Sequence, residues 1–227
     1  MGIMKNAKSR LWVLFVASFI LMAFVIFLAA GALDYWQAWA YLAVGSVSST
    51  FLTLYIISDP RLLENRSRAG FSAEQRPIQK IILCCMIVPL VAVVVVPGLD
   101  HRFGWSNIPL WLTAVGDGLV LASMWIVYRV FKENPFGAAT IEIQKDQKVI
   151  STGPYAIVRN PMYASASIYF VGMSLALGSF WALIPSGLVI LGFFVRLLDE
   201  ERFLSQTLPG YEEYCTKVRW HLIPGLF

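Results

Sequence analysis

Charged residues are scarce in this chain of 227 residues. Asp, Glu, Lys and Arg make up 14% of it, against about 25% in a typical soluble domain, while apolar residues reach 58% and the mean hydropathy is +0.65. So few charges do not cover the surface of a water-soluble globule, and so many apolar residues exclude an intrinsically disordered chain. The composition therefore indicates a protein that spans a membrane several times.

Cysteine and histidine are also rare, with 3 and 2 copies. Such small and scattered sets do not form a disulfide framework or a Cys/His zinc site, so we expect no bound metal. Cys84 and Cys85 adjoin each other inside an apolar run, where a thiol usually behaves as a small buried hydrophobic group. The G-x-G-x-x-G and P-loop patterns are missing as well, so a nucleotide-like cofactor needs a site other than a Rossmann unit.

The 18 basic residues lie beside apolar runs rather than on one polar face. The net charge of +4 and the pI near 9.0 therefore fit membrane flanks better than a nucleic-acid partner. The amino end and the segments 59–80, 129–160 and 196–227 carry 17 of the 18, which leaves only Arg102 for the other side. We thus expect both termini in the cytoplasm, in a multi-pass protein of the cell membrane.

Several uncharged runs have the length of a membrane span. The first, Leu11–Leu33, has 23 residues, enough to cross a hydrocarbon core of about 30 Å at about 1.5 Å per residue. Because a signal-peptide core has only about 7 to 15 residues, we interpret this run as a retained span. Further spans are predicted at Trp36–Ser58, Ile78–Val96 and Leu110–Tyr128.

The stretch Pro161–Leu198 has 38 residues and a single charge, Arg196. One helix of that length would measure about 57 Å, nearly twice the apolar thickness of a bilayer. The stretch must therefore fold back, and Gly178-Ser179 or Pro185-Ser186-Gly187 supplies the turn. We predict an all-α, polytopic membrane helical bundle of about six spans, the last two forming a helical hairpin.

The polar material is concentrated in two segments, 129–160 and 199–227, apart from the loop at 59–77. We divide the chain accordingly into a four-span membrane region, 1–128, and a region of loop, hairpin and tail, 129–227. Any chemistry is expected where the two polar segments meet the membrane.

The segment from Gly153 to Tyr163 is the most polar stretch that leads into a span. It is either an interfacial anchor, with Arg159 at the headgroups and tyrosines in the aromatic belt, or part of a binding site. In the second interpretation Pro161 begins a helix, and Asn160 and Tyr163 face a polar ligand at its amino end, where backbone amides bind carboxylates.

Arg196 and Glu200 lie four residues apart, so they share one face of the helix that leaves the membrane. A local ion pair is one explanation. The other is a carboxylate clamp, because an arginine inside an apolar run needs a partner or an anionic ligand. Asp117, between two glycines, is either functional or a structural hydrogen-bonding group. His101 and His221 are predicted on opposite faces, so they do not form a joint site.

These motifs occur in an order that resembles the isoprenylcysteine carboxyl methyltransferase family of integral membrane enzymes, as a short, prokaryote-type member. The likeness covers roughly residues 130–227. The motifs are Gly153-Pro154-Tyr155, Arg159-Asn160-Pro161-Met162-Tyr163, Glu200-Glu201-x-x-Leu204, Tyr211-x-x-Tyr214 and Ile223-Pro224.

The resemblance implies S-adenosylmethionine as methyl donor, at a site on the cytoplasmic face, and a lipophilic acceptor that enters from the bilayer. Carried over by position, the donor site takes Gln144, Gln147, Lys148, Val149, Ile150, Tyr155, Asn160, Pro161, Met162, Tyr163 and Glu200. Arg196 would meet the acceptor's carboxylate, and Arg159 and Asn160 would take part in catalysis with it. The family usually has histidine at the position of Asn160, and asparagine does not exchange a proton near neutral pH.

A carboxylate acceptor is already ionised and needs no base, so carboxyl O-methylation of a lipophilic acceptor is the predicted activity. Three alternatives stay open at this point. They are a phospholipid N-methyltransferase, an NADPH-dependent membrane sterol or enone reductase, and a non-enzymatic, transporter-like membrane protein. Transporters favour repeated halves with polar features at mid-membrane, whereas here the polar clusters lie at one face.

Overall fold

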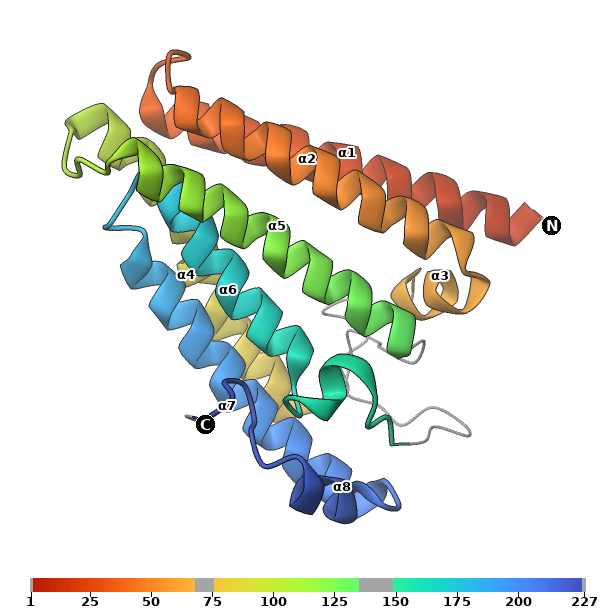
Figure 1. Cartoon of the computed structure of the whole chain (residues 1–227). Coiled ribbons are helices and arrows are strands. Elements are labelled where there is room, and N and C mark those ends of the chain that lie inside the picture. Colours follow the sequence, from red (N-terminus) through yellow and green to blue (C-terminus); the bar gives the residue numbers. More distant parts are fainter. Residues whose placement is uncertain (1, 68–75, 135–148, 226–227) are drawn as a thin grey trace.

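The computed structural model describes residues 2–67, 76–134 and 149–225, and these residues form helices only (Figure 1). The elements are α1 (Gly2–Ala30), α2 (Trp36–Ser58), α3 (Pro60–Ser67), α4 (Pro77–Phe103), α5 (Leu110–Glu133), the 3-10 helix η2 (Gly153–Ala156), α6 (Pro161–Ala176), α7 (Leu183–Thr207) and α8 (Tyr211–Lys217). The all-α fold predicted from hydropathy is confirmed.

The long helices run antiparallel, so their connections gather at two ends of the bundle (Figure 1). At one end lie the turns 31–35, 104–109 and 177–182, which we call the turn end. At the other end α2 leads into α3, α6 begins, and α7 leads into α8, and we call this the α8 end. The two polar segments in which the sequence predicts chemistry, 149–160 and 199–225 in their described parts, both belong to the α8 end.

Four helical segments are long and apolar enough to cross a membrane: Lys8–Ala30, Trp36–Ser58, Pro77–Phe103 and Leu110–Glu133. The α6 helix has 16 residues and measures about 24 Å, shorter than a hydrocarbon core of about 30 Å. The count of six spans and the cytoplasmic placement of both termini therefore stay predictions.

The predicted hairpin is present, and its turn lies at Gly178-Ser179 rather than at Pro185. Gly178 adopts a left-handed backbone with φ of 69°, which glycine tolerates because it has no Cβ. The Ser179 hydroxyl accepts a hydrogen bond from the amide of Ala182 at 3.1 Å. Pro185 lies inside the first turn of α7, where proline replaces an amide without a helical partner.

The third predicted span, Ile78–Val96, is too short, because α4 continues through Pro97 to Phe103. Asp100 in this extra segment is buried. It accepts hydrogen bonds from the Ser106 amide at 2.6 Å, the Ser106 hydroxyl at 2.6 Å and the Ser179 hydroxyl at 2.5 Å. A span predicted from hydropathy stops short of a charged residue. In the folded chain the Asp100 carboxylate is hydrogen-bonded, so it can be buried, and its bonds connect the turns 104–109 and 177–182.

Cys84 and Cys85 are exposed on α4, so the prediction that they are small buried hydrophobic groups is wrong. Their neighbours Ile82 and Met86 take the buried face of the same helix. An apolar run long enough to cross a membrane does not itself reveal which face is covered by protein.

Small residues bring α5 and α6 into close contact along their length. A Cβ on Gly116 would lie 2.2 Å from the backbone nitrogen of Ala176, and one on Gly172 would lie 2.8 Å from the Leu119 side chain. The Ser165 hydroxyl donates to the Ser123 carbonyl at 2.7 Å. This packing, typical of membrane helix pairs, fixes α6 and hence the residues at its amino end.

Candidate active site

The segment before α6 is anchored to the end of α5. Gly153 has φ of 58°, and a Cβ there would lie 2.5 Å from the Glu133 side chain, so glycine allows the close approach. The Thr152 hydroxyl donates to Glu133 Oε2 at 2.8 Å. The two residues at the start of η2, Thr152 and Gly153, are therefore held against the end of α5.

Tyr155, in η2, connects the end of α5 with α8. Its hydroxyl accepts a hydrogen bond from Asn134 Nδ2 at 2.9 Å. Its backbone carbonyl accepts one from the Tyr214 hydroxyl at 2.7 Å. Burial raises the pKa of the Tyr214 phenol well above its usual range, so this donor keeps its proton across the neutral range.

The C-terminal tail, residues 218–225, turns back from α8 toward α7 (Figure 1) and bonds to the residues that precede α6. The amide of Arg159 donates to the Trp220 carbonyl at 2.8 Å, and the amide of Asn160 donates to the His221 carbonyl at 3.0 Å. These backbone bonds hold the tail against the residues that the sequence analysis singled out.

Four polar side chains meet at this crossing, and we call them the Asn160 cluster: Arg159, Asn160, Glu201 and His221. Asn160 Nδ2 donates to Glu201 Oε1 at 2.5 Å. The other carboxylate oxygen of Glu201 lies 3.4 Å from Arg159 Nη1 and 2.9 Å from His221 Nδ1. Arg159 and Glu201 are almost buried, with 11% and 10% of their side chains exposed, so their charges are compensated within the protein.

A second chain of polar contacts lies one helical turn further into α6. Arg196 Nε donates to the Tyr163 hydroxyl at 3.1 Å, and that hydroxyl donates to Glu200 Oε2 at 2.7 Å. Arg196 is buried, with 7% exposure. The phenol of Tyr163, on α6, thus connects two residues of α7. Arg196 and Glu200 are therefore linked through a second helix and not only by their spacing along α7. We call these three residues the Tyr163 chain.

The amino end of α6 has no side-chain cap from its N-cap residue Asn160, although Pro161 occupies the first turn as predicted. The Asn160 amide group faces Glu201 instead. Backbone N–H groups in the first turn of a helix lack helical partners, and they favour an anionic ligand.

A further ion pair, absent from the sequence interpretation, holds the end of α7 against the beginning of α4. Arg76 Nη1 lies 2.8 Å from Asp199 Oδ2, and the buried Gln79 donates to the same carboxylate. Asp199 precedes Glu200 and Glu201, so this contact positions the helical turn that supplies both site carboxylates.

The structure brings together most of the predicted site residues that it describes. Tyr155, Asn160, Tyr163, Glu200, Arg159 and Arg196 all take part in the contacts above. Val149 packs against a small core formed by Leu208, Tyr211, Tyr214 and Val218. Ile150 is partly exposed. Gln144, Gln147 and Lys148 lie outside the described residues.

Sequence reasoning missed two members of the site. His221 lies at the α8 end and His101 at the turn end, stacked on Tyr35 with a ring separation of 4.2 Å, so the two are apart as predicted. His221 was nevertheless left without a role, and Glu201 was quoted only as part of a motif. A histidine immediately before Leu-Ile-Pro in the tail was the available signal, but its partners lie far away in the sequence.

Asp117, the other residue that the sequence singled out, belongs to the middle of α5. Its Oδ1 is buried and makes no hydrogen bond among the described residues. It lies nearer the turn end of α5 than the α8 end, so it is not part of the Asn160 cluster or the Tyr163 chain.

Comparisons with known proteins point to methyl transfer. A family model described as phospholipid methyltransferase matches residues 111–209, which include α5, η2, α6 and α7. The chain is similar to protein-S-isoprenylcysteine O-methyltransferase B of Arabidopsis thaliana, with 27% identity over 141 residues, 60% of this chain and 68% of that protein. It is also similar to protein-S-isoprenylcysteine O-methyltransferase of Schizosaccharomyces pombe, with 36% identity over 76 residues, 33% of this chain and 32% of that protein.

These matches support a methyltransferase, and four helices of the described residues have the length and composition of membrane spans. The matches therefore favour methyl transfer over the reductase and transporter alternatives. Both similar proteins are named as isoprenylcysteine O-methyltransferases, in agreement with the family that the ordered motifs resemble.

Proposed function

We propose that this protein transfers a methyl group from S-adenosylmethionine to the carboxylate of a lipophilic acceptor, at the cytoplasmic face of the cell membrane. The observation that carries the proposal is the convergence of three separate segments at the α8 end. The turn before α6, the Glu200-Glu201 pair of α7 and the C-terminal tail contact one another there. Arg196 lies beside them, one turn of α7 before Glu200.

The residues present suit a donor that carries both an ammonium and a carboxylate group. Glu200 offers a carboxylate for the ammonium, and the uncapped amino end of α6 offers backbone N–H groups for the carboxylate. Arg159 Nε is buried and makes no hydrogen bond among the described residues, which leaves a polar atom for a ligand to satisfy. Tyr155 and the run Asn160–Tyr163 would surround the donor.

We also assign Gln144, Gln147, Lys148, Val149 and Ile150 to the donor site on the family resemblance. Val149 packs beside Tyr211 and Tyr214, and the Tyr214 hydroxyl contacts the Tyr155 backbone. The described end of this run therefore lies beside residues that contact Tyr155.

Arg196 is the proposed partner of the acceptor's carboxylate. A guanidinium binds a carboxylate through two parallel hydrogen bonds, which fixes its orientation as well as its charge. The bound donor supplies an electrophilic methyl group on a sulfonium. The protein then has chiefly to align the two reactants and keep water away, and alignment alone accounts for a large part of such rate enhancements.

The acceptor's apolar part is proposed to lie in the bilayer. α7 presents exposed apolar side chains along the turns before Arg196, among them Leu188, Leu191 and Val195. An acceptor with a long apolar chain would place that chain along this surface and its charged end at Arg196. This arrangement keeps the carboxylate at the interface, where a charge is solvated at little cost.

The test supplies labelled S-adenosylmethionine to the purified protein with prenylcysteine analogues and, separately, with a lipid extract. We expect label in a base-labile ester and donor binding by calorimetry, with NADPH as the negative comparison. The absence of both labelled ester and donor binding would refute the proposal.

Phospholipid N-methylation is the second candidate, because the family model that matches residues 111–209 carries that description. A neutral amine acceptor calls for a base. Asn160 does not exchange a proton near neutral pH, and both ring nitrogens of His221 already face Arg159 and Glu201. Base-stable label in the lipid-extract experiment would select this candidate over carboxyl methylation.

A further inference from the structure

His221 reaches the site from the far end of the sequence. It lies on the tail, two residues before Ile223, and its imidazole enters between the turn that precedes α6 and the end of α7. Its ring nitrogens face residues of opposite charge: Nδ1 lies 2.9 Å from Glu201 Oε2, and Nε2 lies 2.5 Å from Arg159 Nη2. The side chain is 23% exposed, so solvent protons reach it.

These two neighbours decide where the ring proton sits. A guanidinium only donates hydrogen bonds, so Nε2 must be the unprotonated nitrogen that accepts from Arg159. A neutral imidazole whose Nε2 accepts carries its hydrogen on Nδ1, which lies 2.9 Å from Glu201 Oε2 without the geometry of a hydrogen bond. The contacts therefore require a neutral imidazole with its hydrogen on Nδ1, the less common form of a histidine side chain free in water.

We infer that His221 is a positioning residue of the active site, and that its neutral Nδ1–H form holds Arg159, through the bond to Nε2, beside Glu201 and Asn160. The inference rests on the proposed function for the identity of the ligand. His221 itself does not need to touch the donor or the acceptor. It acts through Glu201, which accepts from Asn160, and through Arg159, whose backbone leads directly into the amino end of α6.

Protonation of His221 would break the contact with Arg159. A second ring proton, on Nε2, would point at the guanidinium of Arg159, so the hydrogen bond between them would be lost and two like charges would adjoin. Arg159 would then move away from the turn that we assign to the donor. The site should therefore weaken when His221 takes up a second proton.

The other charged and titratable groups at this point do not produce the same response. Arg159, from the segment before α6, stays protonated at all accessible pH values. Tyr211, from α8, interacts with both Glu201 and Arg159, and burial raises the pKa of its phenol far above neutrality. Glu201, from α7, is the remaining partner: it accepts from Asn160 and lies 2.9 Å from His221 Nδ1.

The first experiment reads the tautomer directly and needs no activity. The chain has only 2 histidines, so nitrogen-15 labelling of histidine gives two imidazole signals, and His101→Gln assigns them. We expect the His221 signal near pH 8 to show a protonated Nδ1 and an unprotonated Nε2. A signal with the proton on Nε2, or with rapid averaging between the two forms, would overturn the inference.

The second experiment measures the affinity for S-adenosylmethionine by calorimetry between about pH 8 and about pH 5.5. We expect Kd to rise about tenfold in the wild-type protein, the equivalent of one charge-assisted hydrogen bond. In His221→Gln the rise should be largely absent, because an amide oxygen can accept from Arg159 and an amide N–H can donate to Glu201, yet the group does not titrate. Any dependence of Kd on pH that remains in His221→Gln is attributed to ionisation of the donor itself.

Two further variants complete the test. His221→Phe has a ring that cannot accept the hydrogen bond from Arg159, so its Kd near pH 8 should already be raised about tenfold or more. Rescue by Gln would separate positioning from packing. His101→Gln, at the turn end, should keep the wild-type pH response. Equal slopes in the wild type and His221→Gln would overturn the inference. Absence of donor binding at every pH would refute the proposed function instead, and the tautomer spectrum would still decide on the contact with Arg159.

Discussion

At the scale of single residues, the site depends on a few side chains that connect α6 to α7. Tyr163 is the central one, since its hydroxyl both accepts from Arg196 and donates to Glu200. The sequence analysis assigned Arg196 to the acceptor and Glu200 to the donor. The structure adds that one phenol connects the two, which gives a physical route by which acceptor and donor sites are kept in register.

Removal of that hydroxyl should impair the reaction without unfolding the protein. Tyr163→Phe deletes two hydrogen bonds to charged groups, each worth about 1.5–3 kcal/mol, so kcat/KM should fall at least about tenfold. Tyr169→Phe is the matched control, because it deletes a hydroxyl of the same helix that pairs with Tyr41 at 2.6 Å, away from the site. Steady-state kinetics that show the same loss in both variants would contradict this role.

The two charged ends of the Tyr163 chain should also respond differently. Glu200→Ala removes the carboxylate that we assign to the donor, so binding of S-adenosylmethionine should disappear in calorimetry. Arg196→Ala should retain most donor affinity and lower turnover, because it removes the proposed partner of the acceptor. Indistinguishable donor affinities in the two variants would refute this division of roles.

At the scale of elements, the position of α6 is set by its contact with α5. The boundaries of α2 agree with the prediction at both ends, whereas α4 extends beyond its predicted end because Asp100 is satisfied by residues of two turns. Hydropathy locates an apolar helix, but it does not reveal which turn residues will compensate a charge at its end. Close helix contact likewise depends on which glycines face a neighbour.

Two glycines of α5, two residues apart, make this contact testable. A Cβ at Gly116 would lie 2.2 Å from the backbone of Ala176, whereas a Cβ at Gly118 would meet no atom within 4 Å. Gly116→Ala should therefore destabilise the protein by about 1–3 kcal/mol through overpacking, seen as a lower unfolding temperature in detergent. Gly118→Ala should be neutral or slightly stabilising, since alanine favours a helix by up to about 1 kcal/mol. Equal unfolding temperatures would show that α5 and α6 do not meet at Gly116.

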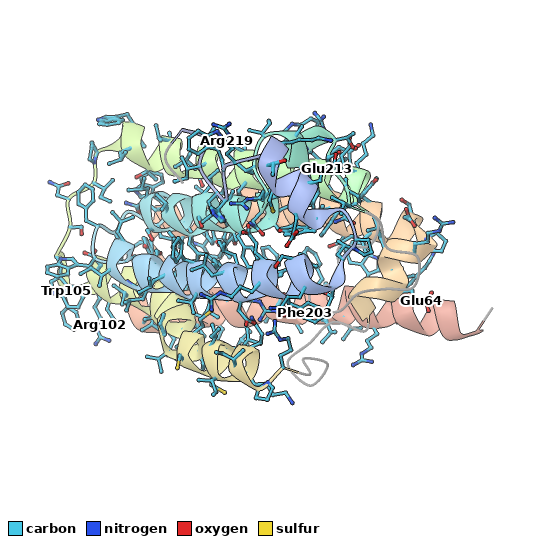
Figure 2. The ribbon with its side chains drawn as sticks, turned by 90° about the horizontal axis from the view of Figure 1, so that it is seen from below. Glu64, Arg102, Trp105, Phe203, Glu213 and Arg219 are labelled. Atoms are coloured by element: carbon cyan, nitrogen blue, oxygen red, sulfur yellow. The ribbon has the colours of Figure 1, made fainter. Side chains whose placement is uncertain are left out.

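At the scale of the whole molecule, the antiparallel helices place the site at one end and the turns at the other. Figure 2 labels Trp105 and Arg102 at the turn end, while Glu213 lies on α8 at the opposite part of the bundle. The distribution of basic residues agrees with this division, since Arg102 is the only one that the charge pattern leaves for the turn end. The positive-inside rule then predicts that the α8 end faces the cytoplasm.

This orientation is open to a labelling experiment. In a chain whose 3 cysteines are replaced by serine, Glu213→Cys should react with a membrane-impermeant maleimide only when the cytoplasmic side is accessible. Trp105→Cys should react only from the opposite side, because both positions are exposed and lie at different ends. Reaction of both positions from one side would mean that the bundle does not cross the bilayer as a whole.

The sequence by itself determined the class of structure, because hydropathy, helix length and the placement of basic residues are properties of short stretches of chain. It located the apolar helices, the need for a hairpin and the polar segment before α6. Only the tertiary structure decided which residues meet. Glu201 reaches Asn160 across 41 positions and His221 reaches Arg159 across 62, and such contacts depend on how α6, α7 and the tail pack together rather than on any local pattern.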